Sequence, residues 1–450
     1  MKTESKIKII NAWLCQIEEK SITPIFCDFI VDKGVIKNVN QKSFDNFVNK
    51  TYKEKPDEYN VGGRVITAPL VNFHDHIYSR LAKGLPTLGP QDNFHNVLKN
   101  LWWKLDKALD EEMIRASAEM AVMESIRNGV TYIFDHHASP LAVKNSLTTI
   151  SSVLMENNLR GMMCYEISDR DGEDVTRNAF DETMNFISNH RNENIGAFVG
   201  LHASFTLKDE TLRRVTQIVN SYNMGIHIHL CEDGIDREIS LKEYKASPIQ
   251  RLKANHLLNK KSILSHGIHL TKEDYPAIAR EGCAIAYNPD SNLNNSVGLP
   301  DFSAVPTSIP ILTGTDGMHA DIAKSMKQLY LLSRHQKNSF NDAFGWFIKI
   351  YFDQLKFVKL YFPDFTKLQQ NDRADFIVWD YIPPTPIDNS NFWGHYIYGI
   401  LERPVISVAQ GGKFLMRNFE IQTANESEIM KNIFKHGKRL HQKFQSMIEE

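Results

Sequence analysis

Eight short apolar runs rich in β-forming residues, separated by longer stretches of helical pattern, limit most strongly how this chain of 450 residues can fold. A β run followed by a helical stretch is typical of a parallel sheet built from βαβ units. Eight such units over roughly 250 to 300 residues match the size of a (β/α)8 barrel. The predicted fold class is therefore α/β with a TIM-like barrel. The predicted strands span residues 66–72, 131–134, 161–166, 195–201, 225–230, 262–265, 283–287 and 309–313.

The two ends of the chain differ from this middle. Residues 1–65 and 370–425 carry further β-rich stretches split by turns, and each end is too short to bury a core of its own. We expect them to pair into one composite β-sandwich beside a barrel that spans residues 66–369. Residues 426–450 have the pattern of a charged helix, which predicts a solvated face or an intersubunit contact.

Composition and charge exclude several classes of function. The 52 Lys and Arg residues nearly balance the 54 Asp and Glu residues, so the net charge of −2 gives no basic field for nucleic acid or an anionic membrane. The start of the chain has no apolar leader and no run of roughly 18 apolar residues follows, so we expect a soluble, cytoplasmic protein without a membrane segment. Five cysteines without a C-x-x-C pair argue against a disulfide framework or a thiolate zinc site.

Histidine and acidic side chains follow four of the predicted strands at the end where a barrel of this type places its reactive groups. The first strand ends in an H-x-H pair, and both imidazoles point to one face because strand side chains alternate. Imidazoles and carboxylates from four strand ends are more than chance placement explains, so we interpret them as one site. The residues are His74, His76, His229, Glu232, His266 and Asp316.

Six segments carry a resemblance to a known family, and they are APLVNFHDHIYSRLAKG, LHASF, IHIHLCEDG, ILSHGIHL, AYNPDSNLNN and LTGTDG. In this order, over about residues 60–320, they resemble the amidohydrolase superfamily, in its branch of metal-dependent deaminases and chlorohydrolase-like enzymes. The segments NLWWKLDKALDEE and FDHHASP are similar to the SsnA-type aminohydrolases, which is a closer likeness.

The resemblance implies roles for the residues at the strand ends. Glu232 would shuttle protons to the ring nitrogen and the leaving amine, and His266 would orient the reacting water. Asp316 would accept the proton of that water as it attacks an sp² ring carbon. The implied ligands of one divalent metal ion are His74, His76, His229 and Asp316.

An absent lysine indicates how many metal ions to expect. Two-metal relatives in the superfamily use a bridging lysine at the end of strand four, whereas the corresponding segment here is GLHASF. We therefore predict a single metal ion. A site of imidazoles and one carboxylate suits zinc, which we favour, and also iron.

Residues that would touch the substrate are less well specified. His202 resembles a substrate-contacting histidine of the family, and a hydrogen-bonded loop residue is the other interpretation. Trp102 and Trp103 would either form a lid over a flat ring or belong to the core. His136 at the second strand end and Asn292 after the seventh would line the site.

The predicted protein is a mononuclear metal-dependent hydrolase acting on a carbon-nitrogen bond other than a peptide bond. Hydrolytic deamination of an aminated, purine-like N-heterocycle is favoured. The alternatives are hydrolysis of a cyclic amide or of another leaving group, because the same activated water serves all of them. A rival of another class is an inactive barrel that acts as a binding protein. The expected partner is a small-molecule substrate, and a homo-oligomer is compatible with the resemblance.

Overall fold

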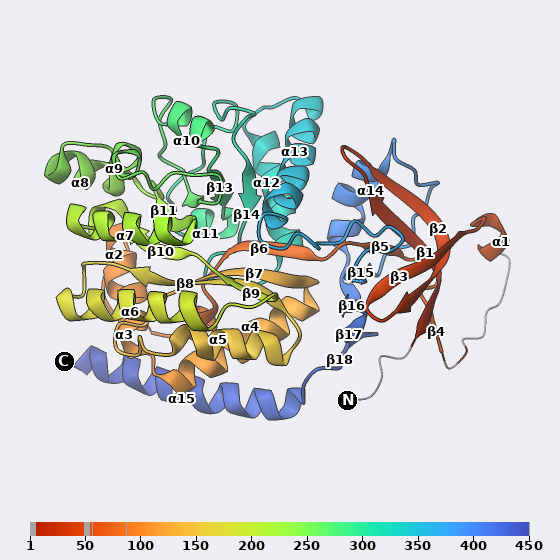
Figure 1. Cartoon of the computed structure of the whole chain (residues 1–450), viewed down its shortest axis with the longest axis horizontal. Helices are drawn as coiled ribbons and strands as arrows, with labels where there is room; N and C mark the ends of the chain where they lie inside the picture. The colour runs from red at the N-terminus through yellow and green to blue at the C-terminus, as the bar shows by residue number, and fades with distance from the viewer. Residues whose placement is uncertain (1–5, 49–54, 56, 87, 450) are drawn as a thin grey trace.

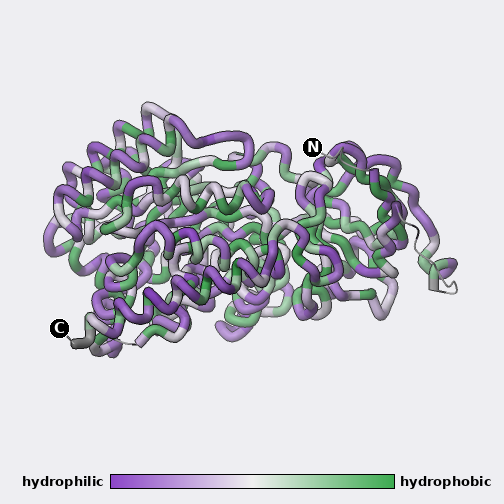
Figure 2. The backbone as a smooth tube through the Cα atoms, turned by 90° about the horizontal axis from the view of Figure 1, so that it is seen from below, coloured by the Kyte–Doolittle hydropathy of each residue, from purple (hydrophilic) through white to green (hydrophobic). Residues whose placement is uncertain are grey.

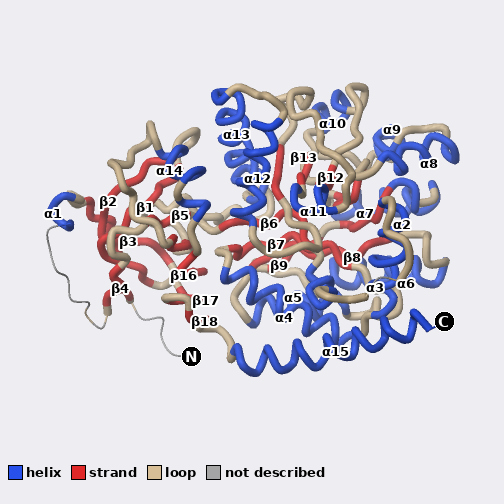
Figure 3. Tube along the Cα trace, turned by 180° about the vertical axis from the view of Figure 1, so that it is seen from behind, coloured by secondary structure: helices blue, strands red, loops and turns tan. Residues whose placement is uncertain are grey.

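The computed structural model describes residues 6–48, 55, 57–86 and 88–449, and its larger part is a parallel β-barrel surrounded by helices (Figures 1 and 3). Eight strands hydrogen bond in chain order, and the short strand β9(Ile195–Ala197) pairs with β8 just before β10 begins. The predicted fold class is confirmed. The barrel strands are β6(Leu70–Asp75), β7(Val130–His137), β8(Arg160–Ile167), β10(Val199–Ala203), β11(Ile226–Leu230), β12(Ile263–His266), β13(Ala284–Tyr287) and β14(Ile311–Thr313).

The first and last strands meet just beyond the end of β14. A parallel bridge joins Asp75 to Asp316, and the backbone N–H of Asp316 donates to the carbonyl of His74 over 2.9 Å. Asn72 adds a side-chain hydrogen bond of 2.7 Å to the hydroxyl of Thr315. These contacts bring the acidic residue after β14 beside the histidines of β6.

Helices follow the strands and cover the outside of the barrel. Helix α4(Glu111–Arg127) begins as predicted, because the Asp110 carboxylate caps it by accepting the N–H of Met113 over 2.9 Å. It ends before Gly129, whose φ of +71° and closeness to Ile377 leave no room for a side chain. The other helices are α5(Ser146–Glu156), α6(Glu173–Asn189), α7(Asp209–Tyr222), α8(Gly234–Tyr244), α9(Pro248–Ala254), α10(Tyr275–Glu281), α11(Pro289–Asn294), α12(Ile322–His335) and α13(Phe340–Val358).

Both ends of the chain contribute to one nine-stranded mixed sheet beside the barrel (Figure 1). Strand β5 of the N-terminal part pairs antiparallel with β15 of the C-terminal part, and the indole of Trp379 donates to Thr67 over 2.9 Å. The strands are β1(Ile7–Ile17), β2(Ile22–Asp32), β3(Val35–Gln41), β4(Glu58–Asn60), β5(Val65–Thr67), β15(Phe376–Trp379), β16(Val405–Gln410), β17(Lys413–Arg417) and β18(Glu420–Ile421). Short helices α1(Asp45–Val48), α14(Phe392–Tyr398) and η4(Ile400–Glu402) complete this part.

The boundary between the two parts lies inside the first predicted barrel strand, 66–72. Residues 65–67 belong to the mixed sheet, and the barrel strand begins at Leu70. Pro69 separates them, because it has no N–H to donate to a ladder. The prediction of one continuous strand at this position is wrong in its start, although its end at the histidines holds.

The C-terminal helix α15(Glu426–Glu449) runs along the barrel (Figure 1). Leu440 and Phe444 are fully buried, and Arg439 pairs with Asp110 at the start of α4 over 2.7 Å. Figure 2 shows hydrophilic and hydrophobic residues alternating along the outer helices, as expected for helices with one buried face. The helix is therefore part of the barrel's packing as well as a solvated face. Among the described residues, no helix is both long and apolar enough to cross a membrane.

Candidate active site

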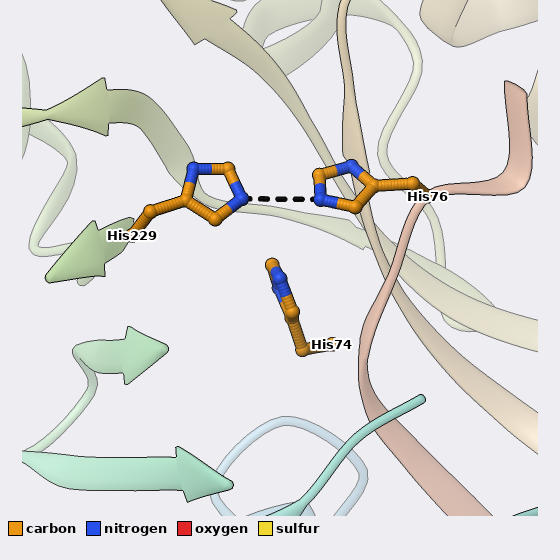
Figure 4. A group of neighbouring side chains, drawn as sticks. All are labelled: His74, His76 and His229. Atoms are coloured by element: carbon orange, nitrogen blue, oxygen red, sulfur yellow. Dashed lines mark hydrogen bonds between the residues drawn. The ribbon is translucent and has the colours of Figure 1, made fainter. Parts of the chain in front are cut away.

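Three histidines converge at the carboxyl ends of the barrel strands (Figure 4). His74 and His76 lie on and just after β6, and their rings face the same way because one residue separates them. His229 comes from β11, and its Nε2 lies 3.1 Å from Nε2 of His76. We call these three residues the histidine cluster. One nitrogen from each lies within 4.8 Å of the other two.

Two rings of the histidine cluster are held by backbone carbonyls. Nδ1 of His76 donates to the carbonyl of His136 over 2.6 Å, and Nδ1 of His229 donates to the carbonyl of His202 over 3.1 Å. A proton on Nδ1 leaves the Nε2 lone pair free. Both Nε2 atoms are therefore oriented as metal ligands.

The third ring, His74, is held by another histidine. Its Nδ1 lies 2.9 Å from Nε2 of His227, which is also 3.1 Å from the hydroxyl of Ser265. Nε2 of His74 is buried and has no hydrogen-bond partner among the described residues. An orphaned buried nitrogen of this kind fits a ligand to a cation.

Asp316 completes the group from the loop after β14. Its Oδ1 lies 3.0 Å from Nε2 of His76 and 3.6 Å from Nε2 of His74, while Oδ2 accepts the hydroxyl of Ser291 over 2.5 Å. Asp316 has a φ of 55°, a left-handed conformation that a non-glycine residue adopts at a cost. The sharp turn directs its carboxylate back into the barrel mouth.

His266 and Glu232 face each other beside this group. Nε2 of His266 lies 3.5 Å from Oε2 of Glu232, and Nδ1 of His266 accepts the amide N–H of Asn292 over 2.8 Å. A neutral His266 that accepts at Nδ1 carries its proton on Nε2, which is directed toward the site. Asn295 also donates to Glu232, over 3.3 Å.

Burial and neighbouring charges set the protonation of these groups. Burial lowers the pKa of His266 to about 4, so the ring is neutral near pH 7. Burial, with the negative charge of Asp316, raises the pKa of Glu232 well above its ordinary value. Burial alone would lower the pKa of His76, but the hydrogen bond and charge of Asp316 raise it to about 9. Burial lowers the pKa well below the ordinary value for His74, His202, His227 and His229.

A pocket of about 670 Å³, including its open mouth, lies over the histidine cluster. Of the predicted substrate contacts, Trp102, Trp103 and His202 line it. Trp102 also packs so closely on Gly317 that a side chain there would lie 3.0 Å from the indole. Trp103 faces His202, with ring centroids 6.2 Å apart. The tryptophan pair lies on η2(Leu98–Trp102) and α3(Trp103–Ala108), after α2(Phe94–Val97).

Two predicted substrate contacts do not line the pocket. His136 is fully buried inside β7, which extends to His137 and so is longer than predicted. Its ring lies 4.5 Å from that of His229. Asn292 is buried on α11, where it contacts His266. Both stand behind the residues that face the pocket.

Sequence reasoning missed part of the pocket lining. Glu166 ends the third predicted strand, and its position alone could have marked it by the rule applied to the histidines. Arg170 lies beyond that strand, and no periodic pattern points to it. The other missed lining residues come from η1(Ile77–Ala82), from α2 to α3, from the end of β10 and η3(Ser204–Thr206), and from the start of α8, and they are Tyr78, Phe94, Leu98, Asp106, Ala203, Phe205, Asp233, Ile235 and Asp236.

The donor set fits one divalent cation. Three imidazole nitrogens and the Asp316 oxygen that lies 3.0 Å from His76 form a mixed N and O group, and burial favours the neutral form of His74 and His229 that a cation requires. His76, whose pKa is raised to about 9 by Asp316, would give up its Nε2 proton to a bound cation. The described residues hold two further groups within the same distance limit, and they are His74, His266 and Asp316, and His136, Glu166 and His229. Each shares a residue with the histidine cluster, so the groups are adjacent.

The sequence and fold define the class of protein. Residues 65–351 match the model of the Amidohydrolase family, and the chain belongs to this family. A 5'-deoxyadenosine deaminase of Methanococcus aeolicus is 25% identical over 446 residues, which cover 94% of this chain and 98% of the relative. A 5-methylthioadenosine/S-adenosylhomocysteine deaminase of Halothermothrix orenii is 25% identical over 416 residues, covering 89% and 91%.

A solved structure shares the fold over nearly the whole chain. The crystal structure of an adenosine deaminase from Xanthomonas campestris with bound zinc has a TM-score of 0.81 and 19% sequence identity. The likeness covers 96% of this chain and 98% of that one. The barrel and the mixed sheet beside it are therefore found together in another protein.

Proposed function

We propose that this protein is a mononuclear, metal-dependent hydrolase that deaminates an aminated, purine-like N-heterocycle. One observation carries the proposal: the histidine cluster and Asp316 lie together, and the facing pair His266 and Glu232 lies directly beside them. The first group offers ligands, and the second offers a hydrogen-bond donor and a proton carrier. The deaminase names of the relatives support the same reaction.

The proposed ligands of the cation are His74, His76, His229 and Asp316. When bound, a divalent cation supplies Lewis acidity that lowers the pKa of water towards neutrality. We propose zinc as the resident ion, with support from the zinc in the adenosine deaminase of the same fold. Iron suits the same donors.

The remaining steps belong to side chains of the chain. Asp316 accepts the proton of the attacking water, because Oδ1 faces the histidine cluster while Ser291 holds Oδ2. Burial favours the protonated form of Glu232, which delivers its proton to the ring nitrogen. Glu232 then takes up the water proton that Asp316 accepted, carries it to the departing amine, and recovers its own proton from the hydroxyl of the tetrahedral adduct. The Nε2–H of His266 stabilises the oxygen that gains negative charge.

The pocket walls support a flat ring as substrate. Trp102, Trp103 and Phe205 surround the floor with aromatic surface, and His202 lies between Trp103 and His229. Aromatic faces favour stacked or edge contacts with a planar heterocycle. A small molecule of this shape is the proposed partner.

Metal analysis combined with an ammonia-release screen tests the proposal. We expect about one zinc or iron ion per chain, and ammonia from at least one purine, pterin, pyrimidine or triazine. One ion without ammonia would favour hydrolysis of a cyclic amide or of another leaving group. Two ions would contradict the single-metal prediction and point to the adjacent group of His136, Glu166 and His229. No turnover of any C–N substrate would favour the inactive binding protein.

A further inference from the structure

A second group of polar side chains lies in the wall of the same pocket. Glu166 is on β8, Arg170 follows that strand, and Trp103 and Asp106 are on α3. All four line the pocket together with His76, His229 and Glu232. We call these four residues the Arg170 cluster. The proton-transfer steps proposed above use none of them, although Trp103 also belongs to the aromatic surface of the pocket.

The positive charge of Arg170 is already neutralised. Its guanidinium contacts Oδ2 of Asp106 over 2.5 Å, Oε1 of Glu166 over 2.8 Å and Oδ2 of Asp171 over 2.9 Å. It also lies 5.3 Å from the ring centroid of Trp103. Three carboxylates around one guanidinium leave an excess of negative charge, which Lys107, paired with Asp171 over 2.9 Å, offsets in part. An incoming anion would therefore find no free cation here.

Buried polar atoms in this wall lack partners of their own. Asp106 is 2% exposed, and its Oδ1 has no hydrogen-bond partner among the described residues, although the Tyr78 side chain lies beside it. The indole Nε1 of Trp103 also has none among them. Glu166 is 6% exposed, and its Oε2 lies 3.7 Å from Nδ1 of His136. The Trp103 N–H thus lacks a partner among the described residues and Oε2 of Glu166 has only a distant one, so both are available to a ligand.

The rest of the pocket has the same sign of charge. Histidines aside, Arg170 is the only cationic side chain among the described lining residues. The acidic lining residues are Asp106, Glu166, Glu232, Asp233, Asp236 and Asp316. A cation bound at the histidine cluster would offset the charge of Asp316, which lies against His76. The wall itself stays acidic.

Building on the proposed function, we propose that the Arg170 cluster is a specificity subsite for a part of the substrate other than the reacting carbon. It takes an uncharged edge or substituent that donates hydrogen bonds, such as ring N–H, amino or hydroxyl groups. It excludes phosphate and carboxylate groups, because these would meet buried carboxylates and lose their hydration without gaining a cation. The expected substrate is a free base or a nucleoside, and nucleotides are rejected.

Equilibrium binding to the metal-loaded full chain tests this subsite without requiring turnover. Calorimetric titration uses three ligands with the same ring. Hypoxanthine offers ring N–H groups, inosine adds sugar hydroxyls, and inosine 5'-monophosphate adds a phosphate. We expect the base or the nucleoside to bind and the monophosphate to bind at least about 30-fold more weakly. Equal or tighter binding of the monophosphate overturns the proposal, and so does failure of both uncharged compounds to bind.

Two variants separate contact with the ligand from support of Arg170. Glu166 and Asp171 both pair with Arg170, but Asp171 does not line the pocket. We expect Glu166→Gln to weaken binding of the uncharged ligand by about 10-fold and to narrow the gap to the monophosphate, with Asp171→Asn within about 3-fold of the wild type. Equal losses in both variants would overturn direct contact by Glu166.

Two controls keep the outcome interpretable. Metal content and thermal midpoint are measured for each variant, and Asp106→Asn replaces Glu166→Gln if the latter does not fold. Absence of ammonia release with the binding preference intact would contradict the proposed deamination alone. Ammonia release from a nucleotide as efficient as that from the nucleoside would contradict the subsite alone.

Discussion

Two regions of the pocket differ in their electrostatics: the floor, which is the histidine cluster with Asp316, and the wall, which is the Arg170 cluster. On the floor, burial holds the imidazoles of His74 and His229 neutral, and neighbouring groups orient their rings. In the wall, burial raises the pKa of Asp106 to about 6 and that of Glu166 to about 7, although Arg170 opposes both shifts. The floor therefore presents electron pairs to a cation, and the wall presents acidic groups to a ligand. In the two proposals above, the floor determines the reaction and the wall determines which molecules bind.

Removing one floor histidine should have the largest effect. We expect His76→Ala to lose most of the bound metal and to reduce kcat/KM at least about 1,000-fold, because several kcal/mol of transition-state stabilisation depend on the cation. Elemental analysis and an activity assay measure both changes. His335→Ala, at an exposed position at the end of α12, should change neither. Full metal content in His76→Ala would contradict its assignment as a ligand.

Replacing Glu232, the proposed proton carrier, should strongly lower kcat without loss of metal. We expect Glu232→Gln to lower kcat by about 10²- to 10⁴-fold, since the amide cannot deliver a proton, while metal content stays at the wild-type level. Steady-state kinetics and elemental analysis on the same preparation decide this. Loss of metal in Glu232→Gln would assign the residue to the floor as a ligand instead.

Removing the two pocket tryptophans should change KM more than kcat. We expect the double variant Trp102→Ala and Trp103→Ala to raise KM about 10- to 100-fold through lost apolar contact, with a smaller change in kcat. Substrate-dependence curves give both constants. Trp346→Ala, which removes a tryptophan that packs on Phe302 outside the pocket, is the matched control. Unchanged kinetics in the double variant would remove the tryptophans from the substrate site.

Asp290, on α11, has a lowered pKa, whereas the pKa values of the acidic groups in the wall are raised. It allows a test with a smaller expected effect. Burial opposes its charge, but contacts with His319, Lys324 and Ser325 lower its pKa to about 2. A carboxyl with a lowered folded-state pKa stabilises the protein above pH 4, and this contribution is lost as the pH falls towards 2.

The stability difference between the wild type and Asp290→Asn should therefore shrink by roughly 1–2 kcal/mol between pH 5 and pH 2. Urea unfolding at a series of pH values measures it. A difference that is independent of pH would mean that the carboxylate charge contributes nothing.

The sequence predicted the floor better than the wall, for physical reasons. Strand alternation and the placement of reactive groups at strand ends locate His74, His76 and His229 in one place, and the structure brings them together there. Their functional roles stay predictions. The wall combines Glu166, which its place at a strand end could have marked, with Trp103 and Asp106, which depend on the path of the short helices from α2 to α3. His136 was expected to line the site, but β7 continues past the predicted strand end and buries this residue.

The contact between β6 and the residues that follow β14 has a consequence for the synthesis of the protein. Asn72 and Thr315, which hydrogen bond across it, are 243 positions apart in the chain. At about 5–20 residues per second, the histidines of β6 emerge from the ribosome roughly ten to fifty seconds before Asp316. During that interval the donor set is incomplete. The proposed ion can therefore meet its full set of ligands only after residue 316 has been synthesised.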